Sequence, residues 1–232
     1  GLYGQGIVYD FNINNPSNYS VRSFGPGEGS CPAASLHRTG GIRYGSTEFG
    51  GSGNGTLFGI SPNGFVPLYS FAGNPDGRGP LGELLPHGGY FWGTASEGGA
   101  SNAGTIFRTD TTGNNYTQVY TFSLPDHFPA AGLTPKNGYL YGVTDGVTGV
   151  SGSTAFKMLA SPPYTETTLY QFDPALEGFW ARSRLVKVGT GAATVFYGTL
   201  YGGGPTSSGS IFKMTPGGNV SIVHIFQNNP HG

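Results

Sequence analysis

Short apolar and aromatic runs alternate along this chain with turns rich in glycine, proline, asparagine and aspartate. Such runs predict β-strands, and the dipeptides Asn63-Gly64 and Asn137-Gly138 are strong signals for tight turns between them. The 3.6-residue apolar period of an amphipathic helix is absent. The pattern therefore predicts an all-β protein.

A four-residue motif recurs along the chain: a small residue, two further residues, then an aromatic. Its copies are Gly6-Ile7-Val8-Tyr9, Gly55-Thr56-Leu57-Phe58, Gly104-Thr105-Ile106-Phe107, Ser153-Thr154-Ala155-Phe156 and Gly209-Ser210-Ile211-Phe212. The aromatic positions are 49, 49, 49 and 56 residues apart. This regularity predicts tandem copies of one structural unit.

Three further features follow the same period. One motif ends in phenylalanine: Val21-Arg22-Ser23-Phe24, Leu68-Tyr69-Ser70-Phe71, Val119-Tyr120-Thr121-Phe122, Leu169-Tyr170-Gln171-Phe172 and Val223-His224-Ile225-Phe226. Another joins an aromatic to glycine: Tyr44-Gly45, Trp92-Gly93, Tyr141-Gly142 and Tyr197-Gly198, with Tyr3-Gly4 as an apparent fifth copy. A short apolar stretch between them is marked by Leu36, Leu84, Leu133 and Leu185.

Four short strands in each unit are typical of a propeller blade. We predict one all-β domain, a β-propeller of about five blades with three to four short antiparallel strands each. The repeat copies are approximately residues 1–24, 25–71, 72–122, 123–172 and 173–226. A β-solenoid is the alternative architecture, although its coils are usually shorter. The sequence starts at the aromatic-glycine motif (Tyr3-Gly4) and ends just after the motif that closes with Phe226. We therefore expect strands from both termini to complete one shared blade. This blade would have three strands unless the chain continues past Gly232.

The order of these motifs resembles the Gloeo/Verruco (GloVer) tandem-repeat family. The successions YGST…GG…GTLFGISPNG…PLYSF…NPDG…P and YGTLYGGG…GSIFKMTPGG…VHIF carry the resemblance, which covers essentially the whole chain. Residues 12–19 of the first copy depart from the usual proline-glycine turn. The resemblance implies an extracellular or surface-displayed bacterial repeat protein, and it supplies no catalytic residues.

Composition and charge narrow the classes of partner. Charged residues make up 10% of the chain and the net charge is −1, with no basic stripe, which argues against nucleic-acid binding. No apolar run approaches the roughly 20 residues of a membrane-spanning helix. The single cysteine, Cys31, excludes an intrachain disulfide and a multi-cysteine metal site. We expect its thiol to be buried or inert, with an intermolecular link as the alternative.

Acidic residues recur at two positions of the repeat. The first position holds Glu28, Asp76, Asp126 and Glu177, with His231 in the fifth copy. The second holds Glu48, Glu97 and Asp145, with Tyr201 in the fourth copy. A ring of carboxylates on one face would suit Ca²⁺ or a polyhydroxyl ligand. The alternative is that each carboxylate caps a turn by accepting backbone N–H groups.

The interval between Phe172 and Tyr197 is longer than in the other copies and carries its own cluster of candidate residues. These are Glu177, Trp180, Arg182 and Arg184. An aromatic ring beside cations can stack on a sugar while guanidinium groups hold hydroxyls or carboxylates. Departures from a repeat are also where function is commonly added to a scaffold. We predict a ligand-binding site here; the alternative is that Trp180 packs between blades and the arginines are solvated.

Four N-x-S/T sequons are candidate N-glycosylation sites if the source is a eukaryote. They begin at Asn18, Asn54, Asn115 and Asn219. The histidines show no metal-ligand spacing, so we predict no metal centre or cofactor, with Ca²⁺ at the repeated carboxylates as the one open alternative.

Three functions fit these observations. The first is a non-catalytic binding module for a glycan or a protein, secreted or displayed at the cell surface. The second is a structural subunit of an extracellular assembly or filament, because low charge and many aromatics suit self-association. The third is a polysaccharide-active hydrolase or lyase. Hydrolysis needs two carboxylates in unlike environments, whereas the repeated acids are related by symmetry, so no catalytic residue is predicted.

Overall fold

The computed structural model describes residues 1–12, 14–123, 128–146 and 152–227. Within these ranges every regular element is a β-strand, apart from the short 3₁₀ turn η1 (Gly191–Ala193). The prediction of an all-β protein is confirmed. No helix among the described residues is long and apolar enough to cross a membrane.

The strands form five antiparallel sheets, each made of strands consecutive in the chain. Sheet 1 contains β1 (Ile7–Asn12) and β2 (Asn15–Ser23), and sheet 2 contains β3 (His37–Thr39), β4 (Ile42–Thr47), β5 (Thr56–Ser61) and β6 (Gly64–Ser70). Sheet 3 contains β7 (Leu85–His87), β8 (Tyr90–Ala95), β9 (Thr105–Thr109) and β10 (Thr117–Thr121). Sheet 4 contains β11 (Thr134–Lys136), β12 (Tyr139–Thr144), β13 (Thr154–Leu159) and β14 (Glu166–Gln171). Sheet 5 contains β15 (Val186–Val188), β16 (Val195–Leu200), β17 (Ser210–Met214) and β18 (Val220–Ile225).

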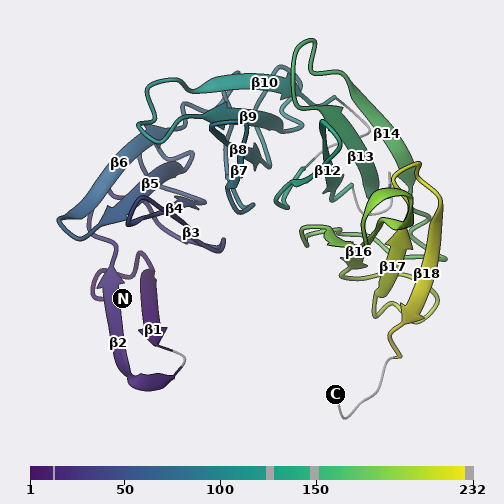
Figure 1. Ribbon diagram of the computed structural model, residues 1–232, viewed down its shortest axis with the longest axis horizontal. Coiled ribbons are helices and arrows are strands. Elements are labelled where there is room, and N and C mark those ends of the chain that lie inside the picture. Colours follow the sequence, from purple (N-terminus) through teal and green to yellow (C-terminus); the bar gives the residue numbers. More distant parts are fainter. Residues whose placement is uncertain (13, 124–127, 147–151, 228–232) are drawn as a thin grey trace.

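The sheets follow one another around an open arc, with outer strands β6, β10, β14 and β18 on its convex side and the short first strands toward its centre (Figure 1). This is the arrangement of propeller blades, so the predicted fold class is confirmed. The described residues do not form the expected shared blade, however: β18 is the outer strand of its own four-stranded sheet, and among the described strands β1 pairs with β2 alone. The Tyr3-Gly4 pair also lies in a turn and not in a strand.

The aromatic-glycine motif makes room for a phenylalanine on the neighbouring strand. Each glycine lies directly opposite the phenylalanine of the next strand, in the pairs Gly45–Phe58, Gly93–Phe107, Gly142–Phe156 and Gly198–Phe212. A Cβ atom added at Gly142 would lie 2.4 Å from Cζ of Phe156. The phenylalanine ring therefore occupies the space that a side chain at the glycine position would fill. The aromatic-glycine motif thus reflects a packing requirement inside each sheet.

A second aromatic contact joins each sheet to the next. The phenylalanine after each outer strand packs on the phenylalanine of the third strand in the following sheet. Ring centroids are 5.0 Å apart for Phe24–Phe58, 5.3 Å for Phe71–Phe107, 5.2 Å for Phe122–Phe156 and 4.7 Å for Phe172–Phe212. These eight rings are 0–2% exposed. The two repeated phenylalanines thus form the core of every boundary between sheets.

Candidate functional site

The first set of repeated acidic residues caps turns. The Glu177 carboxylate accepts hydrogen bonds from the backbone N–H of Asp173 (2.8 Å) and from the Tyr170 hydroxyl (2.7 Å). The hydrogen bond to Glu177 raises the pKa of Tyr170 to about 12. The same arrangement recurs at Glu28, with Gly25 and Arg22, and at Asp76, with Ala72 and Tyr69.

This geometry is what the turn-capping interpretation predicts. It uses both carboxylate oxygens of Glu28 and Glu177, whereas both hydrogen bonds at Asp76 go to Oδ2. The Arg22 guanidinium holds the pKa of Glu28 below its ordinary value. No group of three or more His, Cys, Asp or Glu side chains lies close enough to hold a metal ion in the described part of the chain. Asp126 and His231 lie outside the described residues.

The second set of acidic residues follows the second strand of each sheet, but its members are not all equivalent. Backbone N–H groups at this point donate to carbonyls in the loop that leads into the first strand of the same sheet, in the pairs Glu48–Cys31, Ser96–Gly79, Asp145–Phe128 and Tyr201–Trp180. Ser96 is therefore the counterpart of Glu48 and Asp145. Glu97 lies one residue further along and forms an ion pair with Arg78 (3.2 Å). Glu97 was grouped with Glu48 and Asp145, and the structure corrects this: its position in the repeat is one residue later than theirs.

The four loop residues in these pairs share an unusual backbone conformation. Their φ angles are +55° at Cys31, +62° at Gly79, +60° at Phe128 and +60° at Trp180. Glycine adopts this conformation readily, whereas a tryptophan there is strained. The strain is offset by packing, because the Trp180 ring lies against Phe179 and Tyr201 at centroid distances of 4.8 and 5.9 Å. The same side chain is half-buried, with the Arg182 guanidinium 5.2 Å from its ring centre.

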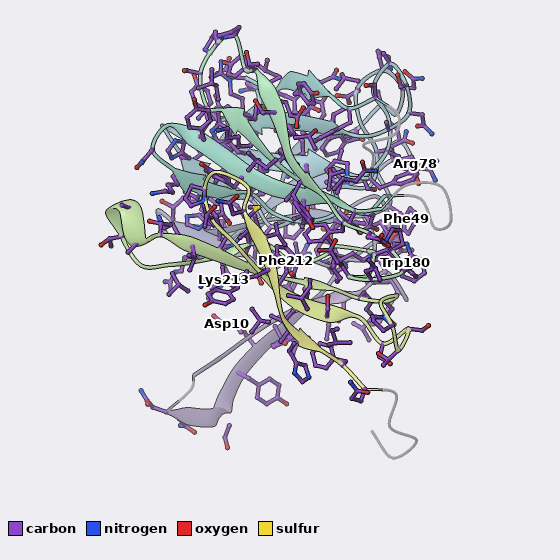
Figure 2. The ribbon with its side chains drawn as sticks, turned by 90° about the vertical axis from the view of Figure 1, so that its right-hand side faces the viewer. Asp10, Phe49, Arg78, Trp180, Phe212 and Lys213 are labelled. Carbon is purple, nitrogen blue, oxygen red and sulfur yellow. The ribbon has the colours of Figure 1, made fainter. Side chains whose placement is uncertain are left out.

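These strand ends and loops surround a cavity of about 390 Å³, here called the axial cavity because four successive sheets contribute to its wall. Its chemically active lining consists of Glu48, Ser96, Glu97, Asp145, Trp180 and Arg182. Figure 2 shows Trp180 on the same side of the molecule as Phe49, which follows Glu48, and Arg78, the partner of Glu97. The volume is that of a small-molecule site.

Asp145 is the most unusual group in the axial cavity. It is only 5% exposed, and its Oδ2 accepts a hydrogen bond from Nε of Arg182 (2.8 Å). Its Oδ1 is buried without a hydrogen-bond partner among the described residues. Burial raises the pKa of this carboxyl, and Arg182 opposes the shift. An unsatisfied buried acceptor costs roughly 1–3 kcal/mol, so the placement of this carboxyl is unfavourable for the stability of the fold.

A second cavity of about 360 Å³ adjoins the first and shares Trp180 and Arg182 with it. Ser183, Thr199 and Tyr201 contribute to its wall. Tyr201 is 73% exposed, and the Thr199 and Ser183 hydroxyls are hydrogen bonded at 2.9 Å. We call this the side cavity. Trp180 and Arg182 thus form a partition with space for a ligand on either side.

The structure separates the residues that the sequence grouped together. Trp180 and Arg182 line the axial cavity with Glu48, Glu97 and Asp145, whereas Glu177 caps its turn elsewhere. Arg184 lines neither cavity; its Nη1 lies 2.5 Å from Oε1 of Glu83, which precedes sheet 3.

Sequence reasoning missed Ser96 and Phe128 as lining residues. A usable signal existed, because Cys31, Gly79, Phe128 and Trp180 each precede the repeated leucine of their copy by the same number of residues. Cys31 is exposed, so its thiol is not buried, and of the two expected states the inert one stays a prediction. Among the sequons, Asn115 and Asn219 are exposed, Asn54 is half-buried and Asn18 lies in β2.

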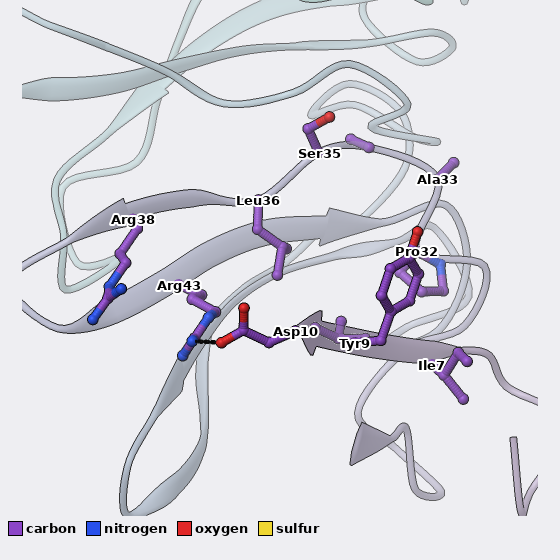
Figure 3. Close-up of a pocket in the computed structure, with 11 residues that line it drawn as sticks. Ile7, Tyr9, Asp10, Pro32, Ala33, Ser35, Leu36, Arg38 and Arg43 are labelled. Carbon is purple, nitrogen blue, oxygen red and sulfur yellow. Dashed lines mark hydrogen bonds and ion pairs between the residues drawn. The ribbon is translucent and has the colours of Figure 1, made fainter. Parts of the chain in front are cut away.

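A larger cavity, of about 580 Å³, lies between β1 and sheet 2 (Figure 3). Asp10 and Arg43 form an ion pair at its edge, and Leu36 and Pro32 contribute apolar surface. None of the predicted ligand-binding residues lines it. It lies beside the strand edge of β1 that has no partner strand, where the other sheets have two further strands. We therefore attribute this space to the incomplete sheet and place the candidate site at the axial cavity.

The fold and the axial cavity together define a propeller-type repeat protein with a ligand-sized site between its blades. The sequence profile of the Gloeobacter/Verrucomicrobia repeat matches residues 1–195, and the chain belongs to this family. The resemblance indicated by the motif order is thus confirmed. No curated protein matches the chain significantly in sequence.

Solved structures share the fold at low sequence identity. A "putative 6-phosphogluconolactonase" from Bacteroides uniformis ATCC 8492 is 16% identical with a TM-score of 0.55, covering 97% of this chain and 67% of that one. The tricorn protease is 10% identical with a TM-score of 0.52, covering 95% and 21%. A neuraminidase-like protein from A/bat/Guatemala/164/2009 is 12% identical with a TM-score of 0.51, covering 96% and 60%. The chain therefore spans less than two thirds of the last two, and the likeness concerns the fold alone.

Proposed function

We propose that this protein is a non-catalytic glycan-binding module and that the axial cavity is its binding site. The observation that carries the proposal is the lining of the axial cavity, which combines the half-buried indole of Trp180 with the carboxylates of Glu48, Glu97 and Asp145. A sugar hydroxyl supplies a donor for the carboxylate, and its C–H face packs on the aromatic ring.

The charges in the cavity favour a neutral ligand. Among the described residues three carboxylates line it, and the one lining cation, Arg182, is ion-paired with Asp145. Arg78 is likewise paired with Glu97 beside the cavity. Neither guanidinium is free to compensate an acidic sugar, and the surplus of acceptors suits a ligand rich in hydroxyl donors. Of the ligand hydroxyls and carboxylates that the sequence analysis assigned to the arginines, this proposal keeps the hydroxyls.

The two adjoining cavities favour an oligosaccharide over a single sugar. Trp180 and Arg182 line both cavities, so one ligand crossing this partition contacts both of its sides. Exposed Tyr201 provides a second aromatic surface in the side cavity. Action outside the cell or at its surface is part of this proposal, because the family resemblance implies it.

The test is a glycan array of neutral, amino and acidic oligosaccharides, run with Ca²⁺ and with chelator, followed by calorimetry on any ligand found. We expect selective binding of neutral oligosaccharides, lost in Trp180→Gly and weakened in Asp145→Asn. The control is Glu177→Gln, which lies outside both cavities. Absence of binding, or equal binding by all three variants, would refute the proposal. Shortened products after prolonged incubation would assign a catalytic role.

A further inference from the structure

One boundary between sheets differs from the others at a close backbone contact. In three copies the small residue at the start of the repeated four-residue motif is a glycine, and a Cβ atom added to it would lie 2.4–2.6 Å from Cδ of a proline in the next loop. These pairs are Gly6–Pro32, Gly55–Pro80 and Gly104–Pro129. The same glycines have φ angles from +97° to +113°. The proline ring thus occupies the space of a side chain, and only glycine fits beside it.

Between sheets 4 and 5 both members of this pair are exchanged. The small residue is Ser153, and the residue that follows Trp180 in the next loop is Ala181 instead of proline. The Ser153 carbonyl still accepts the N–H of Phe172, the same bond that each of the three glycines makes to the phenylalanine of its own copy. Ser153 does not share their positive φ angle. The change from glycine to serine is therefore accompanied by a change from proline to alanine at the residue it faces.

Two hydrogen bonds take the place of the proline contact. The Ser153 hydroxyl donates to the carbonyl of Asp145 (2.7 Å) and accepts the N–H of Ala181 (3.1 Å). Proline has no N–H, so the second bond requires the exchange at position 181. Ser153 and Ala181 are both completely buried, so the hydroxyl uses its donor and one acceptor site away from water. We call this arrangement the serine bridge.

The serine bridge joins two segments that form the wall of the axial cavity. Asp145 is at one end of the bridge, and Ala181 at the other end lies between Trp180 and Arg182. The bridge connects the main chains of these segments, whereas the ion pair of Asp145 with Arg182 connects their side chains. Because φ of +60° is unfavourable for a tryptophan, the loop that carries Trp180 needs such support from its surroundings.

We propose that Ser153 is a positioning residue of the axial cavity: its hydroxyl holds the Asp145 strand end and the Trp180 loop in the arrangement that receives a ligand. Ser153 itself touches no ligand, because it is completely buried and lines neither the axial nor the side cavity. This role rests on the proposed function of the axial cavity, but the serine bridge also has consequences that can be measured without a ligand.

Quenching of tryptophan fluorescence by acrylamide tests the bridge without a ligand. Trp92, the other tryptophan of the chain, is completely buried, so the accessible emission comes from Trp180. We expect Ser153→Ala to increase the quenching of Trp180, because the main chain beside the indole loses its acceptor. The matched control is Ser210→Ala, which removes another completely buried hydroxyl that donates to a main-chain carbonyl. Unchanged quenching in Ser153→Ala, or an equal change in the control, would overturn the proposal.

A double-mutant cycle separates positioning from packing. Ala181→Pro should lower the urea midpoint of unfolding, because it removes the N–H that Ser153 accepts. In a Ser153→Gly background the same substitution should cost much less, since glycine and proline form this contact at three other boundaries. The double variant should thus regain stability, but the quenching of Trp180 should remain raised because the link to Asp145 is missing. Equal costs in both backgrounds, or native quenching in the double variant, would contradict the positioning role.

Ligand affinity distinguishes this inference from the proposed function. Where the native chain binds a neutral oligosaccharide, Ser153→Ala should weaken binding about tenfold, and Ser210→Ala should leave it unchanged. Undiminished affinity in Ser153→Ala would overturn the positioning role and leave the glycan-binding proposal standing. A native chain that binds no glycan would refute the proposed function, whereas the quenching of Trp180 and the double-mutant cycle would still decide whether Ser153 holds the two segments.

Discussion

Asp145 and Arg182 form an ion pair in which the carboxylate is almost completely buried and the guanidinium is more than half exposed, with Nε and Oδ2 2.8 Å apart. The exposed cation leaves the second carboxylate oxygen unsatisfied within the described residues. One carboxylate oxygen is therefore held by Arg182, and the other is buried in the wall of the axial cavity without a partner among the described residues.

Ligand binding should weaken on acidification because Asp145 acts as an acceptor. Burial raises its pKa, so this carboxyl takes up a proton at a higher pH than an ordinary aspartate. A ligand hydroxyl that donates to the carboxylate binds best above this pKa and loses affinity as the pH falls through it. Asp145→Asn should reduce affinity about tenfold at neutral pH and remove this dependence. Calorimetry from pH 7 to pH 4 measures both effects, and a variant with an unchanged pH profile would contradict the assignment.

Replacing Trp180 with glycine should separate binding from folding. The residue has φ +60°, which glycine adopts without strain, and Gly79 occupies the equivalent position in an earlier copy. We expect Trp180→Gly to lose about 30-fold or more in ligand affinity, because aromatic residues at the centre of a site commonly contribute about 2 kcal/mol or more. Urea unfolding of the same variant should show a stability close to that of the native chain. A large loss of stability would mean that Trp180 is chiefly a packing residue.

Equivalent phenylalanines should differ sharply in their contribution to stability. Phe122 is 2% exposed at a boundary between sheets, whereas Phe226 is 42% exposed. We expect Phe122→Ala to lower the free energy of unfolding by about 3–5 kcal/mol. Phe226→Ala should cost less than about 1 kcal/mol, because this ring is already partly in contact with water. Chemical unfolding of both variants measures the difference, and similar costs would contradict the observed arrangement of the sheets.

Removing the Glu177 cap should weaken the turn after sheet 4. Glu177→Ala leaves the Tyr170 hydroxyl and the Asp173 N–H without their acceptor, at a cost of about 1–3 kcal/mol. The native chain should also lose stability between about pH 10 and 12. Folded Tyr170 holds its proton to about pH 12, whereas the unfolded chain releases it near the ordinary tyrosine pKa of about 10. Urea unfolding across this range should show a smaller alkaline loss in the variant than in the native chain.

Adding one methyl group at Gly142 should be destabilising although the residue is in a regular strand. The added Cβ would lie 2.4 Å from Phe156 Cζ and 3.0 Å from Leu133 Cδ2, so it has no space. We expect Gly142→Ala to cost about 1–3 kcal/mol through overpacking. Gly138→Ala measures the cost of added volume at an open position, because nothing lies within 4 Å there, although its positive φ adds some strain of its own. Gly142→Ala is expected to be the more damaging of the two.

Much of the fold could be predicted from the sequence because it depends on contacts within about fifty residues. The Gly142–Phe156 pair lies on adjacent strands of one sheet, and spacing alone placed both residues in the repeat. The candidate site was predictable only in part. Trp180 and Arg182 stood out as departures from the repeat, but their nearness to Glu48 depends on loops from four sheets.

The sequence by itself determined the all-β character, the repeating unit and the aromatic pairs, because alternation, turn residues and motif spacing act locally. The tertiary structure decided which strand ends meet in the axial cavity and that Arg184 pairs with Glu83. It also decided that sheet 1 and sheet 5 remain apart. These features depend on the angle between successive sheets, which accumulates over the whole arc from the packing of many side chains and is not encoded in any single copy of the repeat.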